Sequence, residues 1–203
     1  MEIEMEQVSQ FLKKKGADLV GFCNCREYFP EYSSAVIVGV SVLRLFRKSQ
    51  SDTVQVMNET MDLLNVHGRQ FLYEKGYGAW GALFSQEDMP GRNVVPHREL
   101  AVKAGLGIIG KNFLVITPEF GPRVQFSTIL TTMPVLPGPP LEFDPCATCS
   151  VCVDMCPTGA LGAWFRHEKC IKCYTCVLSC PVGKDVHEFC SIPDLSEIWR
   201  TVR

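Results

Sequence analysis

The sequence predicts a mixed α/β (or α+β) domain followed by a small cysteine-rich module. Helical and strand-like hydrophobic patterns alternate over the first part of the chain, whereas eight of the eleven cysteines lie within residues 146–180. Five of the thirteen residues between the two parts are proline, which is typical of a stiff linker. We therefore expect an α/β domain over 1–132, a linker over 133–145, a module over 146–190 and a tail over 191–203.

The composition of the 203-residue chain supports this organisation and narrows the function. Hydrophobic residues make up 46% and charged residues 21%, as in a globular protein with a proper core. The net charge of −2 provides no general basic field for nucleic acid. The apolar run at 35–43 is too short to span a membrane, and the acidic N-terminus is unlike a targeting segment. We expect a cytoplasmic protein that does not bind membranes.

The first half of the chain contains two helical patterns and three strand candidates. Residues 5–15 repeat apolar side chains at helical spacing until Gly16, and a longer helical pattern runs from Asp52, a candidate N-cap, to Gly76. Residues 19–22 form a short strand candidate. The continuous β-branched run at 35–40 predicts a central strand that is covered on both faces, and residues 77–84 predict a third strand.

The second half of the α/β domain is predicted around a glycine-rich segment at 104–112. A helical stretch from His97 to Lys103 precedes this segment, and strand candidates at 113–117 and 124–132 follow it. The spacing of Gly105, Gly107 and Gly110 matches a dinucleotide-binding fingerprint. That fingerprint follows a strand and opens a helix, however, so the order here argues against it.

The cysteine-rich module contains the same ligand pattern twice. The pattern C-x2-C-x2-C-x3-C-P begins at Cys146 and begins again 24 residues later at Cys170. This spacing is typical of bacterial proteins with two [4Fe–4S] clusters, in which the fourth cysteine of each run binds the other cluster. We assign Cys146, Cys149, Cys152 and Cys180 to one cluster. The second cluster receives Cys170, Cys173, Cys176 and Cys156.

A disulfide framework and a zinc site both fit the cysteines less well. A disulfide framework requires an oxidising compartment, for which the sequence has no signal. Zinc sites usually show pairs of C-x2-C rather than four cysteines with a trailing proline, repeated twice. Cys23 and Cys25 lie far from the runs and are predicted to be buried thiols.

The glycine-rich loop ends in Lys111 and Asn112, which would present a cation and an amide to a pocket. The glycines would let the backbone approach a large planar cofactor or form a tight turn. A structural turn with a solvated lysine is the alternative that the spacing leaves open.

The segment from His97 through AVKAGLGIIGKNFLVITPEFGPRVQFSTILTTMPV, followed by the two cysteine runs, resembles the epoxyqueuosine reductase and reductive dehalogenase superfamily. The resemblance covers roughly residues 95–182 and includes the AGLGIIGKN and ITPEFGPRV blocks. It implies a nitroreductase-like α/β domain that holds cobalamin and receives electrons from the nearer cluster. It also implies cofactor contacts from Ser85, Gln86, Gly107, Gly110, Lys111, Asn112 and Arg123.

Within this resemblance we expect His97, Lys111 and Asp88 to manage protons or charge at the catalytic site. His97 could equally cap or pack its helix, and Lys111 could be an ordinary exposed lysine. The proton-donating aspartate of epoxyqueuosine reductases would fall at Gly91, and Asp88 is only nearby.

The sequence departs from these enzymes in ways that affect the expected partners. Epoxyqueuosine reductases are longer, and their helical repeats after the clusters help to hold tRNA. This chain ends about twenty residues past Cys180 without a basic surplus, so we do not expect tRNA as a partner. It also lacks the twin-arginine leader of membrane-associated dehalogenases.

The leading hypothesis is a cobalamin-dependent reductase that acts on a small substrate. A low-potential ferredoxin or flavodoxin would supply its electrons. One alternative is a ferredoxin-type electron-transfer protein that serves a partner enzyme or corrinoid protein. Another is a reductase that uses flavin in place of the corrinoid.

Overall fold

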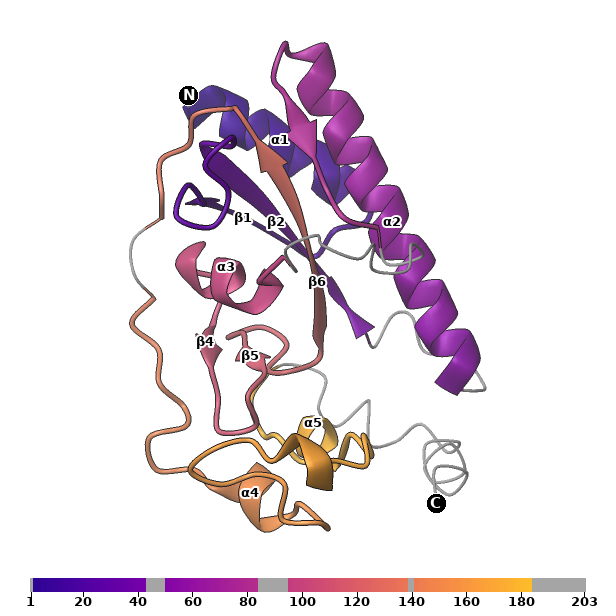
Figure 1. The fold of residues 1–203 in the computed structure, drawn as a ribbon, viewed down its shortest axis with the longest axis vertical. Coiled ribbons are helices and arrows are strands. Elements are labelled where there is room, and N and C mark those ends of the chain that lie inside the picture. The colour runs from indigo at the N-terminus through magenta and orange to yellow at the C-terminus, as the bar shows by residue number, and fades with distance from the viewer. Residues whose placement is uncertain (1, 43–49, 84–94, 139–140, 184–203) are drawn as a thin grey trace.

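The computed structural model describes residues 2–42, 50–83, 95–138 and 141–183 (Figure 1). Its α-helices are α1 (Glu2–Lys14), α2 (Gln50–Glu74), α3 (His97–Lys103), α4 (Val151–Asp154) and α5 (Thr175–Leu178). Its strands are β1 (Leu19–Asn24), β2 (Ser34–Ser41), β3 (Ala79–Trp80), β4 (Ile108–Ile109), β5 (Val115–Ile116) and β6 (Val124–Thr131). A 3₁₀ turn at His167–Lys169 lies within the cysteine-rich module.

The α/β domain is built on a four-stranded sheet with the order β1-β2-β6-β3, in which all neighbouring strands are antiparallel. Strand β2 is buried along its whole length, as the continuous apolar run predicted. Its partner β6 pairs with it over eight residues, with Ile37 opposite Thr128. A separate hairpin of β4 and β5 follows α3 and carries the glycine-rich segment.

Helices cover both faces of the sheet and create two apolar cores. One face carries α1 and α2, and its core contains Leu12, Leu64 and Ile129. The opposite face carries α3, and its core contains Ile37, Leu100 and Leu130. Alternate residues of β6 therefore point into opposite cores, as strand geometry requires. Cys23 and Cys25 are buried thiols in the second core, as predicted.

Several predicted elements have different lengths in the structure. Helix α1 begins earlier than predicted because its acidic first turn and basic last turn suit a helix over Glu2–Lys14. Helix α2 begins at Gln50, so Asp52 is inside the helix and is not its N-cap. Within the described residues, the strand predicted over 77–84 pairs only at Ala79–Trp80; β6 ends opposite Ala79, at Thr131, so residues before Ala79 have no strand partner.

The cysteine-rich module lies at the end of the molecule beyond the β4–β5 hairpin, far from α1 (Figure 1). The predicted boundary at 132 does not coincide with the edge of the core, since the side chain of Met133 is fully buried beside α1 and α2. Within the described residues, no helix is both long and apolar enough to cross a membrane.

Candidate iron–sulfur centre

The thiols of the first predicted ligand set lie close to one another. Burial raises the pKa of Cys152, and the nearby thiols of Cys180, Cys146 and Cys149 raise it further. Cys180 comes from the second cysteine run, yet its other thiol neighbours, Cys146 and Cys149, belong to the first. The structure therefore places Cys180, the fourth cysteine of the second run, near the three cysteines with which the spacing had grouped it.

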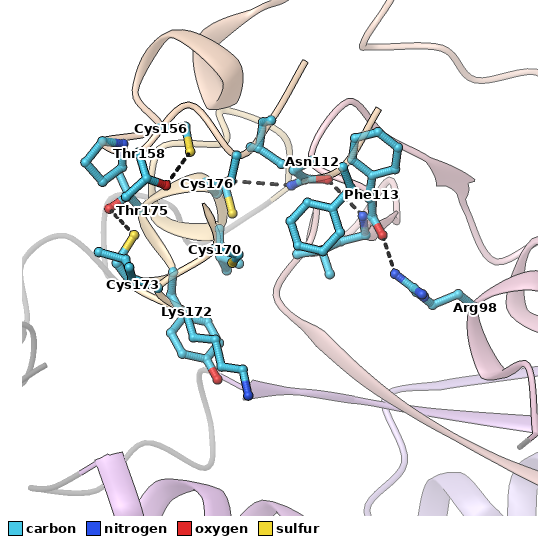
Figure 2. Close-up of a pocket in the computed structure, with 18 residues that line it drawn as sticks. Arg98, Asn112, Phe113, Cys156, Thr158, Cys170, Lys172, Cys173, Thr175 and Cys176 are labelled. Carbon is cyan, nitrogen blue, oxygen red and sulfur yellow. Dashed lines mark hydrogen bonds between the residues drawn. The ribbon is translucent and has the colours of Figure 1, made fainter. Parts of the chain in front are cut away.

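The second predicted ligand set lines one cavity of about 180 Å³. Figure 2 shows Cys156, Cys170, Cys173 and Cys176 around this cavity, next to residues of the β4–β5 hairpin. Burial raises the pKa of Cys176 to about 11, and neighbouring thiols, Cys173 first among them, add to the effect.

The donor set and the cavity fit a [4Fe–4S] cluster at the second site. No three His, Cys, Asp or Glu side chains in the described ranges converge on the position of a single metal ion. Four thiolates around a cube of irons are spread more widely than the ligands of one zinc ion. A cavity lined by four cysteines that do not converge on one point is therefore consistent with a cluster.

Backbone strain is concentrated at the same cavity. Among the described residues, Phe113, Lys172 and Tyr174 are the three non-glycine residues with positive φ, at 62°, 54° and 57°. All three line the cavity that holds the second cysteine set. Strained backbone conformations of this kind cluster at ligand sites. The strain therefore supports a bound group at this cavity.

Two threonine hydroxyls lie beside ligand sulfurs. The Oγ1 atom of Thr175 is 3.3 Å from the Sγ atom of Cys173, and that of Thr158 is 3.8 Å from the Sγ atom of Cys156 (Figure 2). Each threonine follows its cysteine by two positions, a spacing that could have identified them in the sequence. Hydroxyl donors near the sulfurs tune the reduction potential of a cluster.

The ITPEFGPRV block fastens the α/β domain to the module. Arg123 is fully buried, and its Nη1 atom donates hydrogen bonds of 3.1 Å to the carbonyl oxygens of Val177 and Cys180. Its Nη2 atom donates to the carbonyl oxygen of Val182. The resemblance implied a contact to cobalamin for Arg123, whereas the structure places its guanidinium among carbonyls within and just after α5.

The loop after β4 also contacts the module. The Nδ2 atom of buried Asn112 lies 3.5 Å from the carbonyl oxygen of Cys176, and its Oδ1 atom accepts from the backbone N–H of Leu114. Exposed Lys111 reaches the carbonyl oxygen of Ala147 at 3.4 Å. The predicted cation and amide are thus present at the end of the loop, and each contacts a cysteine run.

The glycines of this loop permit close packing within the hairpin. A Cβ atom at Gly107 would collide with the carbonyl oxygen of Ile116, and one at Gly110 would collide with the Ile116 side chain. In the structure these glycines therefore allow the two strands of the hairpin to approach closely. Helix α3 precedes the segment and β5 follows it, which confirms that it is not a dinucleotide-binding fingerprint.

His97 sits at the start of α3 with its Nδ1 atom 2.9 Å from the hydroxyl oxygen of Thr128 on β6. Burial lowers the pKa of its imidazole to about 4, and the carboxylate of Glu99 offsets this only in part. The ring is therefore neutral near pH 7, which suits packing of α3 better than proton donation. Three further predicted residues, Ser85, Gln86 and Asp88, lie outside the described part of the chain.

Comparison with known proteins agrees with this geometry. The profile of the 4Fe-4S binding domain family matches residues 163–183. An epoxyqueuosine reductase from Bacillus anthracis is 47% identical over 64 residues, 32% of this chain and 17% of the relative. A tetrachloroethene reductive dehalogenase from Sulfurospirillum multivorans is 42% identical over 64 residues, 30% of this chain and 13% of the relative. The chain is related to both groups, as its sequence indicated.

Solved structures show that the likeness extends over the fold. An epoxyqueuosine reductase bound to an epoxyqueuosine-modified tRNA-Tyr stem loop gives a TM-score of 0.63 at 20% identity, covering 96% of this chain and 66% of that one. A reductive dehalogenase with B12-dependent chemistry gives 0.68 at 18% identity, covering 95% and 35%. The chain therefore shares the mixed α/β fold but spans only part of each relative. Both groups of relatives are oxidoreductases.

The expectation that tRNA is not a partner is wrong. It rested on chain length and on a net charge of −2. The curated relatives include epoxyqueuosine reductases, and one solved relative is bound to a tRNA stem loop. Net charge sums over the whole molecule and does not describe a local binding surface, so it gave no ground for excluding tRNA.

The described residues do not by themselves form a cobalamin site. Of the contacts that the resemblance implied, Arg123 and Asn112 are engaged with the module, and Gly107 and Gly110 pack within the hairpin. No step of a reaction is therefore assigned to a corrin ring.

Proposed function

We propose that this chain is an iron–sulfur oxidoreductase whose C-terminal module holds two [4Fe–4S] clusters and delivers electrons to a site associated with the α/β domain. The observation that supports the proposal is that Cys180 has the thiols of the first run as neighbours, while Cys156 lines one cavity with Cys170, Cys173 and Cys176. One set uses Cys180 and the other uses Cys156, so each cluster would be held by both cysteine runs. When bound, the clusters would supply one-electron transfer.

The protein's own part in this function is to fix the module against the α/β domain. Arg123 donates to the backbone carbonyl of Cys180, and Asn112 donates to that of Cys176. Each ligand set therefore has one cysteine that is held by the α/β domain. Both side chains are buried, and they come from the loop of the β4–β5 hairpin and from the residue before β6. Fixed positions matter because the rate of electron transfer depends steeply on the distance between donor and acceptor. We infer that the α/β domain is the destination of the electrons.

Iron analysis after anaerobic purification tests the cluster assignment. We expect about eight irons per chain, from two clusters of four. Cys180→Ala and Cys176→Ala should each lose iron, and Cys25→Ala is a matched control because that thiol is buried outside the runs. Fewer than about four irons per chain in the reconstituted wild-type protein would rule out two clusters.

The electron acceptor is proposed from the relatives. The B12-dependent chemistry of the related dehalogenase supports cobalamin, and a nitroreductase-like α/β domain would suit either cobalamin or flavin. Absorption spectra of the protein titrated separately with cobalamin and with flavin distinguish the two. A spectral shift with cobalamin alone supports the corrinoid reductase, and binding of neither supports an electron-transfer protein that serves a partner.

That second candidate is favoured by one observation. The buried polar groups expected in a cofactor pocket, Arg123 and Asn112, are used to hold the module. Substrate assays decide between the candidates. Dithionite-reduced protein is offered an epoxyqueuosine-modified tRNA stem loop and, separately, tetrachloroethene, which represent the two groups of relatives. Two electrons consumed per product formed identify a reductase.

A further inference from the structure

Arg123 is a buried positive charge beside the predicted cluster site of Cys180 and the first cysteine run. The side chain is fully buried, although it belongs to the α/β domain and contacts the module. Three carbonyl oxygens, those of Val177, Cys180 and Val182, accept hydrogen bonds from its two terminal nitrogens. An arginine offers donors in a planar fork, which suits several acceptors at fixed positions.

A short path joins this charge to the sulfur of Cys180. The carbonyl of Val182 accepts from Arg123, and the N–H of the same residue donates to the Cys180 sulfur. The carbonyl of Cys180 itself also accepts from Arg123, at 3.1 Å. The buried guanidinium is thus fixed beside the backbone of this ligand.

Close packing at two glycines keeps this arrangement in place. Gly121 and Gly183 both have positive φ, at 58° and 104°. A Cβ atom at Gly121 would collide with the carbonyl oxygen of Val182, and one at Gly183 would collide with the backbone of Phe120. The two segments therefore approach as closely as backbone atoms allow, which leaves little room for Arg123 to shift.

We propose that Arg123 is a positioning residue that raises the reduction potential of the cluster bound by Cys146, Cys149, Cys152 and Cys180. Because it comes from the α/β domain, it would make the electron affinity of this cluster depend on docking of the module. The inference rests on the two-cluster assignment proposed above.

The physical reason is electrostatic. Reduction adds one negative charge to the cluster, and a fixed positive charge nearby stabilises the reduced form more than the oxidised form. Such an interaction is much stronger in a buried site than in water. Net charge and hydrogen bonds around the sulfurs are known to set cluster potentials. The second cluster, beside Asn112 and Phe113, has no such buried cation among the described residues that line its cavity.

Redox titration of the anaerobically purified full chain, followed by EPR, tests the proposal. In Arg123→Gln we expect one of the two midpoint potentials to fall while the other stays at its wild-type value. Arg123→Lys, which keeps the charge but loses the fork, should show a smaller fall. Lys111→Gln is the matched control because exposed Lys111 also donates to a carbonyl of the module, and solvent should screen its charge.

Iron content separates electrostatic from structural effects. Arg123→Gln with eight irons and two unchanged potentials would overturn the proposal, as would an equal shift of both clusters. If Arg123→Gln loses iron, Arg123→Lys decides, and an unchanged potential in that variant counts against the proposal. Failure of the wild-type protein to hold two clusters would instead remove the proposed function itself.

Discussion

The Nδ1 atom of His97 lies 2.9 Å from the hydroxyl oxygen of Thr128, which ties α3 to an inner strand of the sheet. The bond joins the first residue of the helix to the middle of β6. It lies between an apolar helix face and an apolar sheet face, so protonation of the ring is costly there.

His97 should make the protein less stable in acid. Its folded-state pKa of about 4 is below the ordinary value of 6.5, so the unfolded chain binds the proton first as pH falls. Its contribution is fully present above pH 6.5 and is lost between pH 6.5 and 4, by roughly 3 kcal/mol. Denaturation of His97→Gln at several pH values should show a correspondingly weaker loss of stability.

Thr128→Val is the control for this effect. It removes the hydrogen bond but leaves the packing around His97 in place, and burial is the main cause of the lowered pKa. The pH dependence should therefore survive in Thr128→Val. A histidine NMR titration that places the pKa of His97 near its ordinary value would contradict the prediction.

Asn112→Ala should weaken attachment of the module. The substitution leaves the Cys176 carbonyl and the Leu114 N–H without their partner, at a cost of about 1–3 kcal/mol. Amide hydrogen exchange should accelerate in residues 170–183 and much less in the large sheet. Asn24→Ala is the control, because exposed Asn24 accepts only a local bond from the Arg26 N–H, and it should leave the module unaffected.

Tyr174 should tolerate glycine better than alanine. Its φ of 57° costs a non-glycine residue about 1 kcal/mol, so Tyr174→Gly should be more stable than Tyr174→Ala by that amount. Ser150 occupies the equivalent position of the first cysteine run but has a φ of −126°. The same pair of substitutions at Ser150, the residue before α4, should therefore show a smaller preference for glycine, and chemical denaturation measures both pairs.

Thr175→Val should lower the potential of the second cluster. The hydroxyl lies 3.3 Å from the Cys173 sulfur, and its loss removes a donor that stabilises the added negative charge. Thr158→Val provides a graded comparison, because its oxygen is 3.8 Å from the Cys156 sulfur of the same cluster. Spectroelectrochemical titration should give a smaller fall for Thr158→Val, and equal potentials in all three proteins would refute the role.

Local patterns predicted much of the fold and the ligand spacing. The β-branched run at 35–40 identified buried β2, and the helical stretch from His97 to Lys103 matches α3. Cysteine spacing alone predicted two ligand sets, which stay a prediction, and the structure places Cys180 near the first run and Cys156 near the second. These successes share a cause, since side-chain periodicity and ligand spacing are properties of short segments.

The contacts of Arg123 and Asn112 could not be predicted in this way. Their carbonyl partners lie 54 or more residues further along the chain and have no side-chain signature. The strand predicted at 113–117 shortened to Val115–Ile116 because Phe113 takes a left-handed conformation in the turn. Such a conformation depends on tertiary packing, which residue preferences do not record.

The position of Arg123 immediately before β6 has a consequence for biosynthesis. All four strands of the large sheet are complete by Thr131, before the first cysteine of the runs is reached at Cys146. A chain that emerges from the ribosome N-terminus first can therefore finish its sheet before any cluster ligand appears. The sheet, and Arg123 beside it, would then be in place before the cysteines emerge, so the clusters would be inserted next to a folded α/β domain.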